Sequence, residues 1–472
     1  MAYALGVSDI IDTFLLAQIV PTIIQAMISG GAGEILVIRK EKKENSSFET
    51  FYAFVVLMIV AMMGLTYYFG LDLFIPLFDL ETSKVQLFYS FSLLFILNMI
   101  PGVFVSILRP QLYAKGLYKF FTYASVVSQL AGLLIILTTV NKYGIYSFAF
   151  GIVGSNVLNA VWFLIKADFK VLQLFSLKAW KEELEELYTM LRSVFSLSLQ
   201  TLFNHFGTFW ERSLSVKYMT GGYLSALNYS KNLSEMPNTV LLSSVLTTSY
   251  IEQVNLHKSD EPAFQKYTNQ IYRMLIKAGF LFQIIMLLFA PLLIIILFRR
   301  GKFDNNAVEI TMILFSILTI SFLPKLIMSY LTRTMYILGE YNKLLIATIL
   351  KFLVQFAVMI SFVTSISHTI PVAILASNLF ICFFLVMYTK KHVSLPPYSF
   401  LIIRLLAATL FSFVMLKLHI ILLPFYIHLN TFEITLLYLP LLLASAVLLF
   451  FYMKKLGLIQ PLLKKMKLKT SN

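Results

Sequence analysis

The stretch "MYILGEYN" at residues 335–342 is a polar turn between two long apolar runs, and it has a near copy in "LYAKGLYK" at 112–119. The shared pattern Leu/Met-Tyr-x-x-Gly-x-Tyr aligns three pairs of residues: Tyr113 with Tyr336, Gly116 with Gly339, and Tyr118 with Tyr341. A chance match between residue types that are common in membrane loops is the alternative explanation. If the match is an internal repeat, the chain contains two related halves.

The composition restricts the chain to one broad class. Of its 472 residues, 59% are hydrophobic and only 13% are charged, and the mean hydropathy is +0.81. These values are typical of a polytopic membrane protein and exclude a water-soluble globule of this size. The formal charge of +15 gathers in short loops and at the C-terminus, which indicates orientation in a membrane and not nucleic-acid binding. The single cysteine, Cys382, excludes an intramolecular disulfide and a Cys-based metal site.

Apolar runs of about twenty residues predict the membrane-spanning helices. We expect thirteen, near residues 10–38, 51–71, 86–108, 119–140, 144–165, 189–212, 222–250, 270–298, 307–337, 342–364, 369–389, 398–421 and 432–453. The two turns then lie six helices apart, as do Pro21 and Pro237, each inside a long helix. An even offset predicts a parallel repeat.

Basic residues in alternate loops test this scheme, because Lys and Arg accumulate on the cytoplasmic side. The basic residues of the first, third and fifth loops share one side with Lys390, Lys391 and the basic C-terminal tail. The loop "RRGKFDNN" at 299–306 is the exception, since it is basic and falls on the outer side. The scheme also places Met1 outside, with no helix before it to carry it across. We therefore expect the opening helix of a six-plus-six-plus-two architecture to be absent from this sequence.

The expected organisation is an all-α, two-lobe transporter of about thirteen helices. The N-terminal lobe covers 1–166 and holds helices 2–6 of the complete fold, and a cytoplasmic amphipathic linker follows at 167–188. The C-terminal lobe covers 189–395 and holds helices 7–12, and residues 396–472 add two further helices and a basic cytoplasmic tail.

Ionisable side chains inside a membrane helix are costly and usually face a cavity or a partner. In "NYSKNLSEMPNTV", Lys231 and Glu235 are one turn apart on one helix face, and Pro237 removes a backbone hydrogen bond nearby. We interpret this face as the lining of a cavity; an ion pair that only cements packing is the alternative. Lys325 follows Pro324 about a third of the way into its expected helix, and we favour a cavity position for it as well.

For the other charged residues in expected helices, a structural role is at least as well supported as a functional one. Glu211 and Arg212 lie near an expected helix end beside Trp210, where an interfacial anchor and a functional role are equally supported. Asp12 precedes the apolar part of its helix, so a solvated helix start is favoured slightly over attraction of a cation. Lys351 and Arg404 rank lower, because either stem could snorkel to the surface.

The sequence contains no P-loop, no G-x-G-x-x-G, no G-x-S-x-G and no H-E-x-x-H, and its histidines have no metal-ligand spacing. ATP hydrolysis and hydrolase chemistry are therefore not expected, and no metal site is expected. A cation-lined space between two helical halves suits an anionic substrate that crosses the membrane. Three alternative functions remain. A lipid-linked glycosyltransferase would need an acidic catalytic pair and a sizeable outer loop, whereas the expected outer loops are short. A drug exporter would prefer an acidic cavity, whereas the expected cavity is basic, and a membrane scaffold would need neither Lys231 nor Lys325 for its function.

The run "LFRRGKFDNNAVEITMILFSILTISFLPKLIMSYLTRTMYILGEYNKLL" at 297–345 resembles the MurJ/MviN family of lipid II flippases. The family has an F-x-x-G-x-F loop, a buried lysine and an R-x-x-Y-A-L-G-D-like turn, matched here by Phe298, Gly301, Phe303, Lys325, Arg333, Tyr336, Leu338, Gly339 and Glu340. The segment with Asp12, Pro21, Gly31 and Ala32 is similar to the family's second helix, and the segment with Glu235 and Pro237 is similar to its eighth. The resemblance implies the fourteen-helix MOP exporter fold, which is shared with MATE transporters.

Two family arginines have no counterpart. Gln25 and Ala26 stand where an arginine follows the second-helix proline, and Asn232 stands at the eighth-helix arginine. The family's first helix, which also carries arginines, is not represented. These departures keep another lipid-linked glycan, such as an O-antigen or exopolysaccharide precursor, as an alternative cargo to lipid II.

The resemblance implies a flippase of the bacterial inner membrane that moves a polyprenyl-pyrophosphate-linked saccharide by alternating access. It also implies that the chain is not an enzyme and needs no cofactor, with coupling to membrane potential, H⁺ or Na⁺ as the possible energy sources. The implied partners are the lipid-linked glycan, membrane lipids and cell-envelope biosynthesis enzymes, with no nucleic acid. The expected substrate-binding residues are Lys231, Glu235, Lys325, Asp12, Arg333 and Arg212.

Overall fold

A computed structural model describes residues 6–29, 46–114, 117–167, 177–238, 243–299, 301, 303–364, 368–429, 432–441 and 444. The regular structure in these segments is entirely helical. Its elements are α2 (Asp9–Ser29), α4 (Ser46–Phe69), the 3₁₀ turn η1 (Leu71–Leu73), α5 (Phe74–Phe78), α6 (Thr82–Ala114), α7 (Tyr118–Tyr143), α8 (Tyr146–Ala167), α9 (Leu177–Tyr218), α10 (Tyr223–Pro237), α11 (Ser243–Ser259), α12 (Glu261–Leu288), α13 (Ala290–Phe298), α14 (Asn305–Ile320), α15 (Phe322–Ile337), α16 (Tyr341–Phe362), α17 (Thr369–Thr389) and α18 (Tyr398–His428).

Each of the thirteen expected spans coincides with at least one helix in the described part of the chain. By length and hydropathy, 8 single helices can cross a membrane, or up to 10 spans if each of two bent pairs is one span. The remaining expected spans correspond to α9, to the polar pair α10 and α11, and to the short apolar helix Phe432–Leu441. The protein is therefore an all-helical polytopic membrane protein, as expected.

Two boundaries differ from the expectation. The charged segment that was predicted as a linker over 167–188 contributes the first residues of α9, which is continuous over 42 residues. The single helix expected over 222–250 is described as two helices, α10, which ends at Pro237, and α11, which starts at Ser243; residues 239–242 lie outside the described residues. Both differences matter for the site, because they lengthen α9 and shorten α10.

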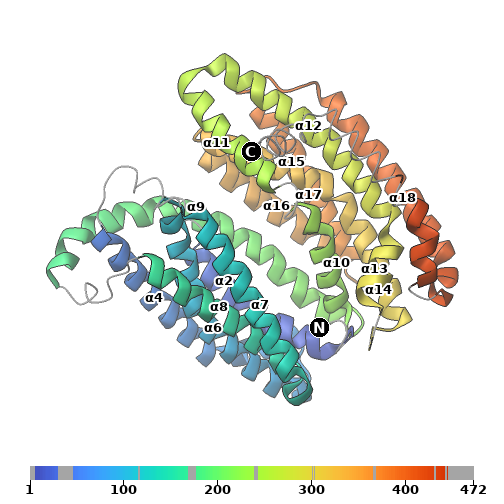
Figure 1. The fold of residues 1–472 in the computed structure, drawn as a ribbon, viewed down its shortest axis with the longest axis horizontal. Helices are drawn as coiled ribbons and strands as arrows, with labels where there is room; N and C mark the ends of the chain where they lie inside the picture. Colours follow the sequence, from blue (N-terminus) through green and yellow to red (C-terminus); the bar gives the residue numbers. More distant parts are fainter. Residues whose placement is uncertain are drawn as a thin grey trace, which may run out of the picture.

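The helices form two groups (Figure 1). In the first group, α2 packs against α6 and α4, and α8 packs against α6 and α7. In the second, α12 packs against α15 and α18, and α17 packs against α15 and α16. The long helix α9 contacts α2 and α4 on one side and α16 on the other. We call the first group the N-terminal lobe and the second the C-terminal lobe, with α9 between them.

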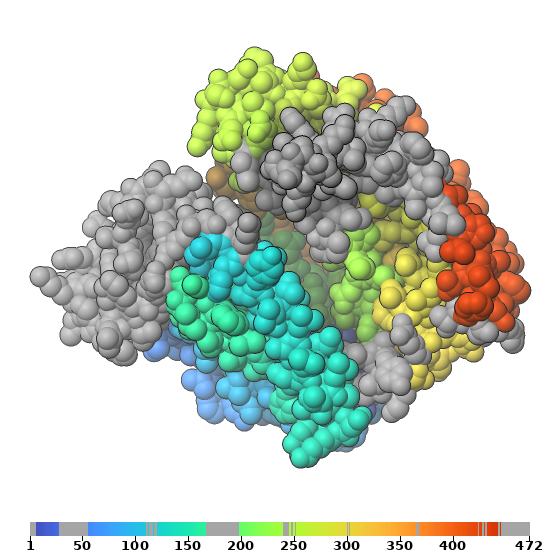
Figure 2. All heavy atoms as spheres, in the orientation of Figure 1, coloured from blue at the N-terminus to red at the C-terminus, as the bar shows by residue number. Residues whose placement is uncertain are grey.

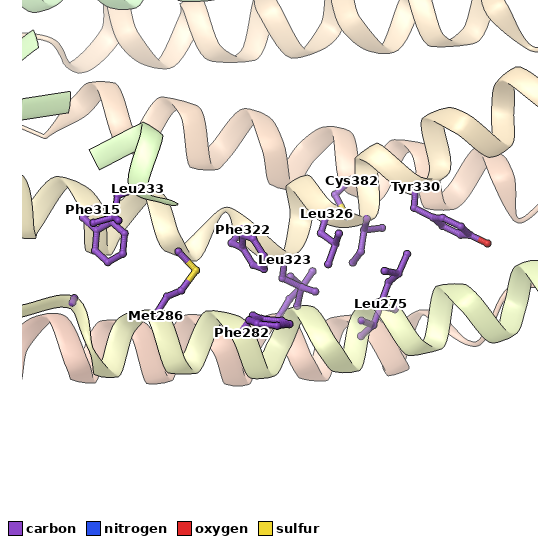
Figure 3. Close-up of a cluster of buried hydrophobic side chains, with 14 of the residues drawn as sticks. Leu233, Leu275, Phe282, Met286, Phe315, Phe322, Leu323, Leu326, Tyr330 and Cys382 are labelled. Carbon is purple, nitrogen blue, oxygen red and sulfur yellow. The ribbon is translucent and has the colours of Figure 1, made fainter. Parts of the chain in front are cut away.

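The core of the C-terminal lobe holds one face of α10. Leu233 points from α10 into a cluster that includes Phe315 and Met286 (Figure 3), and each of these side chains is less than 9% exposed. Farther along the same cluster, Phe322 and Leu326 of α15 lie against α12. The apolar face of α10 is thus fixed in this core, which leaves its polar face directed elsewhere.

Outside these cores the helices present apolar side chains to their surroundings, as lipid-facing helices do. On α18, Ile403, Leu410 and Ile421 are more than 60% exposed. Between the lobes the surface is hollowed, and the α9–α10 region lies at the bottom of the hollow (Figure 2). A polar helix face at the bottom of this hollow meets neither lipid nor a packed core.

The repeated turn has the same hydrogen-bonding pattern in both halves. After α15, the Glu340 N–H donates to the Met335 carbonyl at 3.0 Å, and after α6 the Leu117 N–H donates to the Leu112 carbonyl at 2.9 Å. These are equivalent positions in the sequence alignment of the two turns. After α15 the bond is the 6→1 bond of a Schellman motif, while Lys115 and Gly116 of the first turn lie outside the described residues. The two turns follow α6 and α15, which are six spans apart. The structure therefore supports an internal repeat over a chance match.

Gly339 occupies the position of the Schellman motif that needs a positive φ, and its φ is +74°. Gly339→Ala is expected to lower the free energy of unfolding by about 1–2 kcal/mol, because a Cβ is disfavoured in the left-handed region. Thermal unfolding in detergent measures the loss. Gly339→Asn is the matched control and should cost less, since asparagine tolerates this conformation. An alanine variant as stable as the parent would contradict this role.

The basic loop at 299–306, the exception to the predicted charge pattern, has a structural use at Arg299. The Arg299 guanidinium donates from Nη1 to the carbonyl oxygens of Tyr426 at 3.3 Å and Leu429 at 2.7 Å. These carbonyls belong to the last turn of α18 and the residue after it, where helix carbonyls have no intrahelical partner. Arg299 therefore ties α13 to the end of α18. Arg300 and Lys302 lie outside the described residues.

Candidate cation cluster between the lobes

The candidate site is built on α10, whose polar face carries Lys231 and Glu235. The two residues are separated by one helical turn, so they project from the same side, as the sequence predicted. On the opposite side, Leu233 anchors the helix in the C-terminal core. Because α10 ends at Pro237, both charges lie in the last two turns of a short helix.

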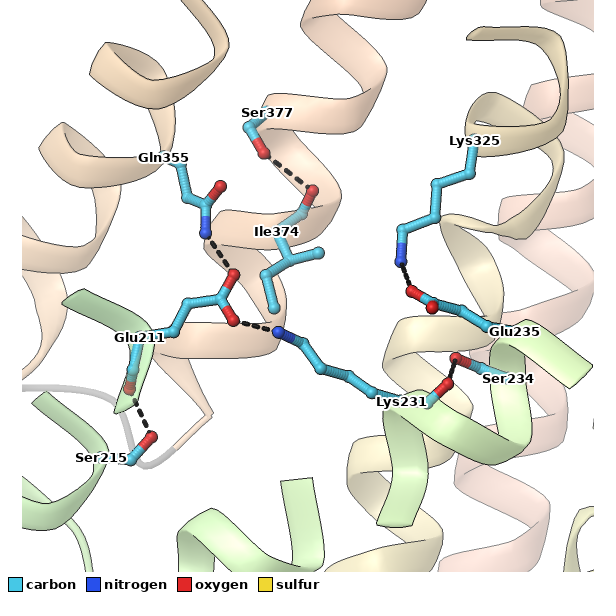
Figure 4. Close-up of polar contacts among 9 residues, drawn as sticks. All are labelled: Glu211, Ser215, Lys231, Ser234, Glu235, Lys325, Gln355, Ile374 and Ser377. Atoms are coloured by element: carbon cyan, nitrogen blue, oxygen red, sulfur yellow. Dashed lines mark hydrogen bonds and ion pairs between the residues drawn. The ribbon is translucent and has the colours of Figure 1, made fainter. Parts of the chain in front are cut away.

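Lys231 forms an ion pair with Glu211 of α9 (Figure 4). The Glu211 carboxylate is only 6% exposed and accepts a second hydrogen bond, at 2.5 Å, from the Gln355 side-chain amide of α16. Each carboxylate oxygen thus has its own donor, as a buried carboxylate requires. Glu211 joins three helices: α9, α10 and α16.

Lys325 forms the second ion pair, with Glu235, at 2.8 Å. Lys325 lies in the first turn of α15, just after the chain bends by 44° between α14 and α15. The Lys325 side chain is 23% exposed and the Glu235 side chain is 50% exposed. A half-exposed carboxylate on a helix whose other face is packed indicates that the pair borders the hollow between the lobes.

Lys231 and Glu235 are one turn apart, but they do not pair with each other as the packing alternative assumed. Lys231 turns toward Glu211, while Glu235 turns toward Lys325, so the two pairs extend from α10 in different directions (Figure 4). Glu211, for which an interfacial anchor and a functional role were equally supported, is a buried member of this cluster. Its position two turns before the end of α9 was hidden because the helix was expected to stop near residue 212.

Lys351 of α16 completes the cluster, although the sequence ranked it low. It precedes Gln355 by one turn and therefore faces the same side of α16. It interacts electrostatically with Lys325, Glu211, Lys231 and Glu235. Among the residues that the structure describes, it has no hydrogen-bond or ion-pair partner. The spacing of Lys351 and Gln355 in the otherwise apolar "LLIATILKFLVQFAVMI" was the signal that could have identified both.

Three lysines and two glutamates thus meet at the middle of the molecule. Since each glutamate is paired with one lysine, the cluster carries one positive charge in excess. Such an arrangement can bind an anion at Lys351 directly, and at Lys231 and Lys325 when the anion displaces a carboxylate. Within the described segments, no group of three or more His, Cys, Asp or Glu side chains could hold a metal ion.

Asp12 lies at the other end of α10, and the expectation of a solvated helix start is wrong for it. Its side chain is buried, and it accepts hydrogen bonds from the backbone N–H of Gly222 at 3.0 Å and of Ser225 at 2.7 Å. These N–H groups are unsatisfied donors at the start of α10, where an anionic acceptor is favoured. Asp12 therefore links α2 of the N-terminal lobe to the first turn of α10.

Gly222 makes this close approach feasible. Its φ is +85°, and a Cβ built there would lie 2.4 Å from the Val7 side chain. Any other residue would be strained and would push the two lobes apart at this point. The remaining two predicted residues lie away from the cluster. Arg212 donates from Nη1 to the Leu15 carbonyl of α2 at 2.5 Å, and Arg333 lies two turns beyond Lys325, near the end of α15.

The comparisons with known proteins agree with this architecture. The family model described as "Lipid II flippase MurJ" matches residues 1–443. None of the curated proteins searched matches the sequence. Among solved structures, "Lipid II flippase MurJ, inward closed conformation" is similar with a TM-score of 0.74 and 18% identity, over 98% of this chain and 95% of that one.

Two other solved structures belong to the wider superfamily. An inward-facing multidrug resistance MATE family transporter of the MOP superfamily has a TM-score of 0.65 and 13% identity, over 81% of this chain and 91% of that one. A MOP superfamily transporter from Pyrococcus furiosus, described as having a binding pocket of reverse polarity, has a TM-score of 0.52 and 17% identity, over 81% and 86%. At these identities the similarities establish the fold, which is the MurJ- and MATE-like fold.

Proposed function

The chain belongs to the lipid II flippase MurJ family, and from this premise we propose that it carries a polyprenyl-diphosphate-linked saccharide, lipid II or a close relative, across the bacterial cytoplasmic membrane. It is a transporter and not an enzyme. The observation that carries the proposal is the cluster of Lys231, Lys325 and Lys351 beside the hollow between the lobes. Ammonium groups in a desolvated site bind phosphate oxygens strongly, so the cluster suits the diphosphate of the cargo.

The sides of the membrane follow from the basic loops. The ends of α6, α8 and α17 are followed by basic residues and lie at the end of the molecule opposite to Gly222. By the positive-inside rule we assign that end, together with the C-terminus, to the cytoplasm. The Asp12 contact with α10 then closes the outer side, and the hollow faces the cytoplasm, where the cargo would enter.

Transport by alternating access requires the Asp12 contact to break when the outer side opens. We propose that Asp12 and Arg212 act in this outer closure, because Asp12 accepts hydrogen bonds from the start of α10 and Arg212 of α9 donates one to α2. We further propose that Arg333 contributes to cargo binding, that transport is coupled to the membrane potential, H⁺ or Na⁺, and that cell-envelope biosynthesis enzymes contact the protein.

A different lipid-linked glycan is the second candidate cargo. The specific observation in its favour is that Gln25 of α2 stands where the family has a cavity arginine, and that its side chain lies against Gly102 of α6. The three lysines of the cluster are instead on α10, α15 and α16. A cation-coupled drug exporter would prefer an acidic cavity, which the excess positive charge disfavours.

Depletion of the protein in its native host, with labelled lipid-linked precursors, tests the proposal. We expect lipid II to accumulate on the inner leaflet. Accumulation of another diphosphate-linked glycan would establish the second candidate. If no precursor accumulates, the flippase proposal is wrong, and the parent protein expressed from a plasmid provides the control for restored export.

A further inference from the structure

The charge state of the cluster raises a question about how the cargo first binds. In the structure Lys231 is engaged by Glu211, and Lys325 is engaged by Glu235. Both ammonium groups are therefore neutralised before any substrate arrives. An incoming diphosphate would have to compete with a carboxylate that is held by the protein at high effective concentration.

Lys351 is different from the other two lysines. It lies ten residues into the 22-residue helix α16, so about 15 Å of helix separates it from the first residue, Tyr341. This distance is too long for its stem to bring the ammonium group to the membrane surface. An isolated cation at this depth is unfavourable in the absence of a ligand. Among the described residues no carboxylate pairs with it.

The neighbours of Lys351 do not neutralise it. Gln355 is on the same face of α16, but its amide donates to Glu211 and cannot serve Lys351 as an anion. Glu211 and Glu235 are both within electrostatic range, yet each already has a lysine in hydrogen-bonding contact. Lys351 also interacts with Lys231 and Lys325, whose like charges repel it. An anionic ligand would relieve this repulsion.

We propose that Lys351 is the residue that captures the diphosphate first, and that Glu211 and Glu235 are internal substitutes for the diphosphate, displaced from Lys231 and Lys325 as the cargo enters. This inference rests on the proposed function. Capture at Lys351 places one phosphate next to both ion pairs, and exchange of each carboxylate for a phosphate oxygen then proceeds without leaving an ammonium group unpaired. In the empty state the two carboxylates neutralise Lys231 and Lys325, so release of cargo leaves only the Lys351 ammonium group without a counter-ion.

Binding of farnesyl diphosphate to the full chain in lipid nanodiscs tests the inference. Lys351→Gln is expected to raise the dissociation constant roughly tenfold to a hundredfold, the value of one charge-assisted hydrogen bond, whereas Lys351→Arg keeps most of the affinity. Glu211→Gln is expected to lower the dissociation constant, because it frees Lys231. Lys343→Gln, two turns away on α16, is the matched control and should leave binding unchanged.

Stability separates ligand binding from a structural role. The ligand-free Lys351→Gln variant is expected to melt no lower than the parent, because it loses a charge with no partner; a residue that only stabilised the fold would lower the melting temperature. If the parent binds farnesyl diphosphate and Lys351→Gln binds it equally well, or if Glu211→Gln binds it more weakly, the inference is wrong and the proposed function stands. If the parent binds farnesol as tightly as farnesyl diphosphate, recognition of the diphosphate is refuted, and the proposed function fails with it.

Discussion

Lys231→Gln is expected to reduce transport of the lipid-linked diphosphate roughly tenfold to a hundredfold, because it removes one charge-assisted hydrogen bond to the cargo. The same substitution leaves the buried Glu211 carboxylate with Gln355 as its only side-chain donor. Breaking a buried ion pair in this way costs about 3–5 kcal/mol of stability. Transport assays and thermal unfolding of the purified protein measure the two effects, which are the largest that the site predicts.

The double variant Lys231→Gln/Glu211→Gln separates stability from transport. It replaces both charges with neutral amides of similar size, so the fold should regain most of its stability. Transport should stay low, since the cation that binds the cargo is still missing. If the ion pair only cements helix packing, the double variant would transport as well as the parent, and the substrate-binding role of Lys231 would be refuted.

Lys325 provides an internal comparison. Its partner Glu235 is half exposed, so loss of this pair should cost little stability, about 1 kcal/mol or less. The effect of Lys325→Gln on transport should nevertheless resemble that of Lys231→Gln. A large effect on transport with a small effect on stability is what a cargo-binding lysine predicts.

Asp12→Ala is expected to open the outer side of the molecule. The Asp12 carboxylate is the acceptor for two N–H groups of α10, and hydrogen bonds to charged groups are worth about 1.5–3 kcal/mol each. Their loss should shift the equilibrium between the outward-closed and outward-open forms by at least about tenfold. Spin labels at Leu73→Cys and Asn306→Cys, both exposed and on different lobes, report the change as a longer distance. Native Cys382 is buried and can be kept.

Asp9→Ala is the matched control for this experiment. Asp9 is one turn earlier in α2, but its ion pair, at 3.0 Å, is with Lys84 of α6 in the same lobe. Its removal should leave the distance distribution of the labelled pair unchanged. A distribution that is the same in the parent and in Asp12→Ala would show that Asp12 does not hold the lobes together.

The sequence predicted most of the fold for a clear physical reason. A backbone in lipid must satisfy its hydrogen bonds internally, so long apolar runs become helices and their lengths give the spans. The repeated turn was recognisable because a Schellman motif needs glycine at one position, which Gly339 shows with its positive φ. The end of α10 at Pro237 and the extension of α9 were not predicted, because these polar helices are held by neighbours and not by lipid.

For the site, the sequence identified the residues better than their partners. Lys231, Glu235 and Lys325 stood out because charge inside a membrane is costly. Their pairing depends on how α9, α10 and α15 pack, which spacing along one helix cannot show. Gln355 was not singled out because a neutral amide is less costly in an apolar helix than a charge. Lys351 was ranked low because its stem could in principle reach the surface, whereas its depth in α16 prevents this.

Transfer of lipid II between the leaflets of vesicles that contain only the purified chain tests the central claim most directly. The fraction of lipid II that is exposed to an impermeant reagent should equilibrate in vesicles with the parent protein. In vesicles with Lys231→Gln/Glu211→Gln, present at equal amount and folded, it should stay close to the protein-free level. Equal transfer by the two proteins, or no transfer by the parent of either lipid II or another diphosphate-linked glycan, would contradict the account.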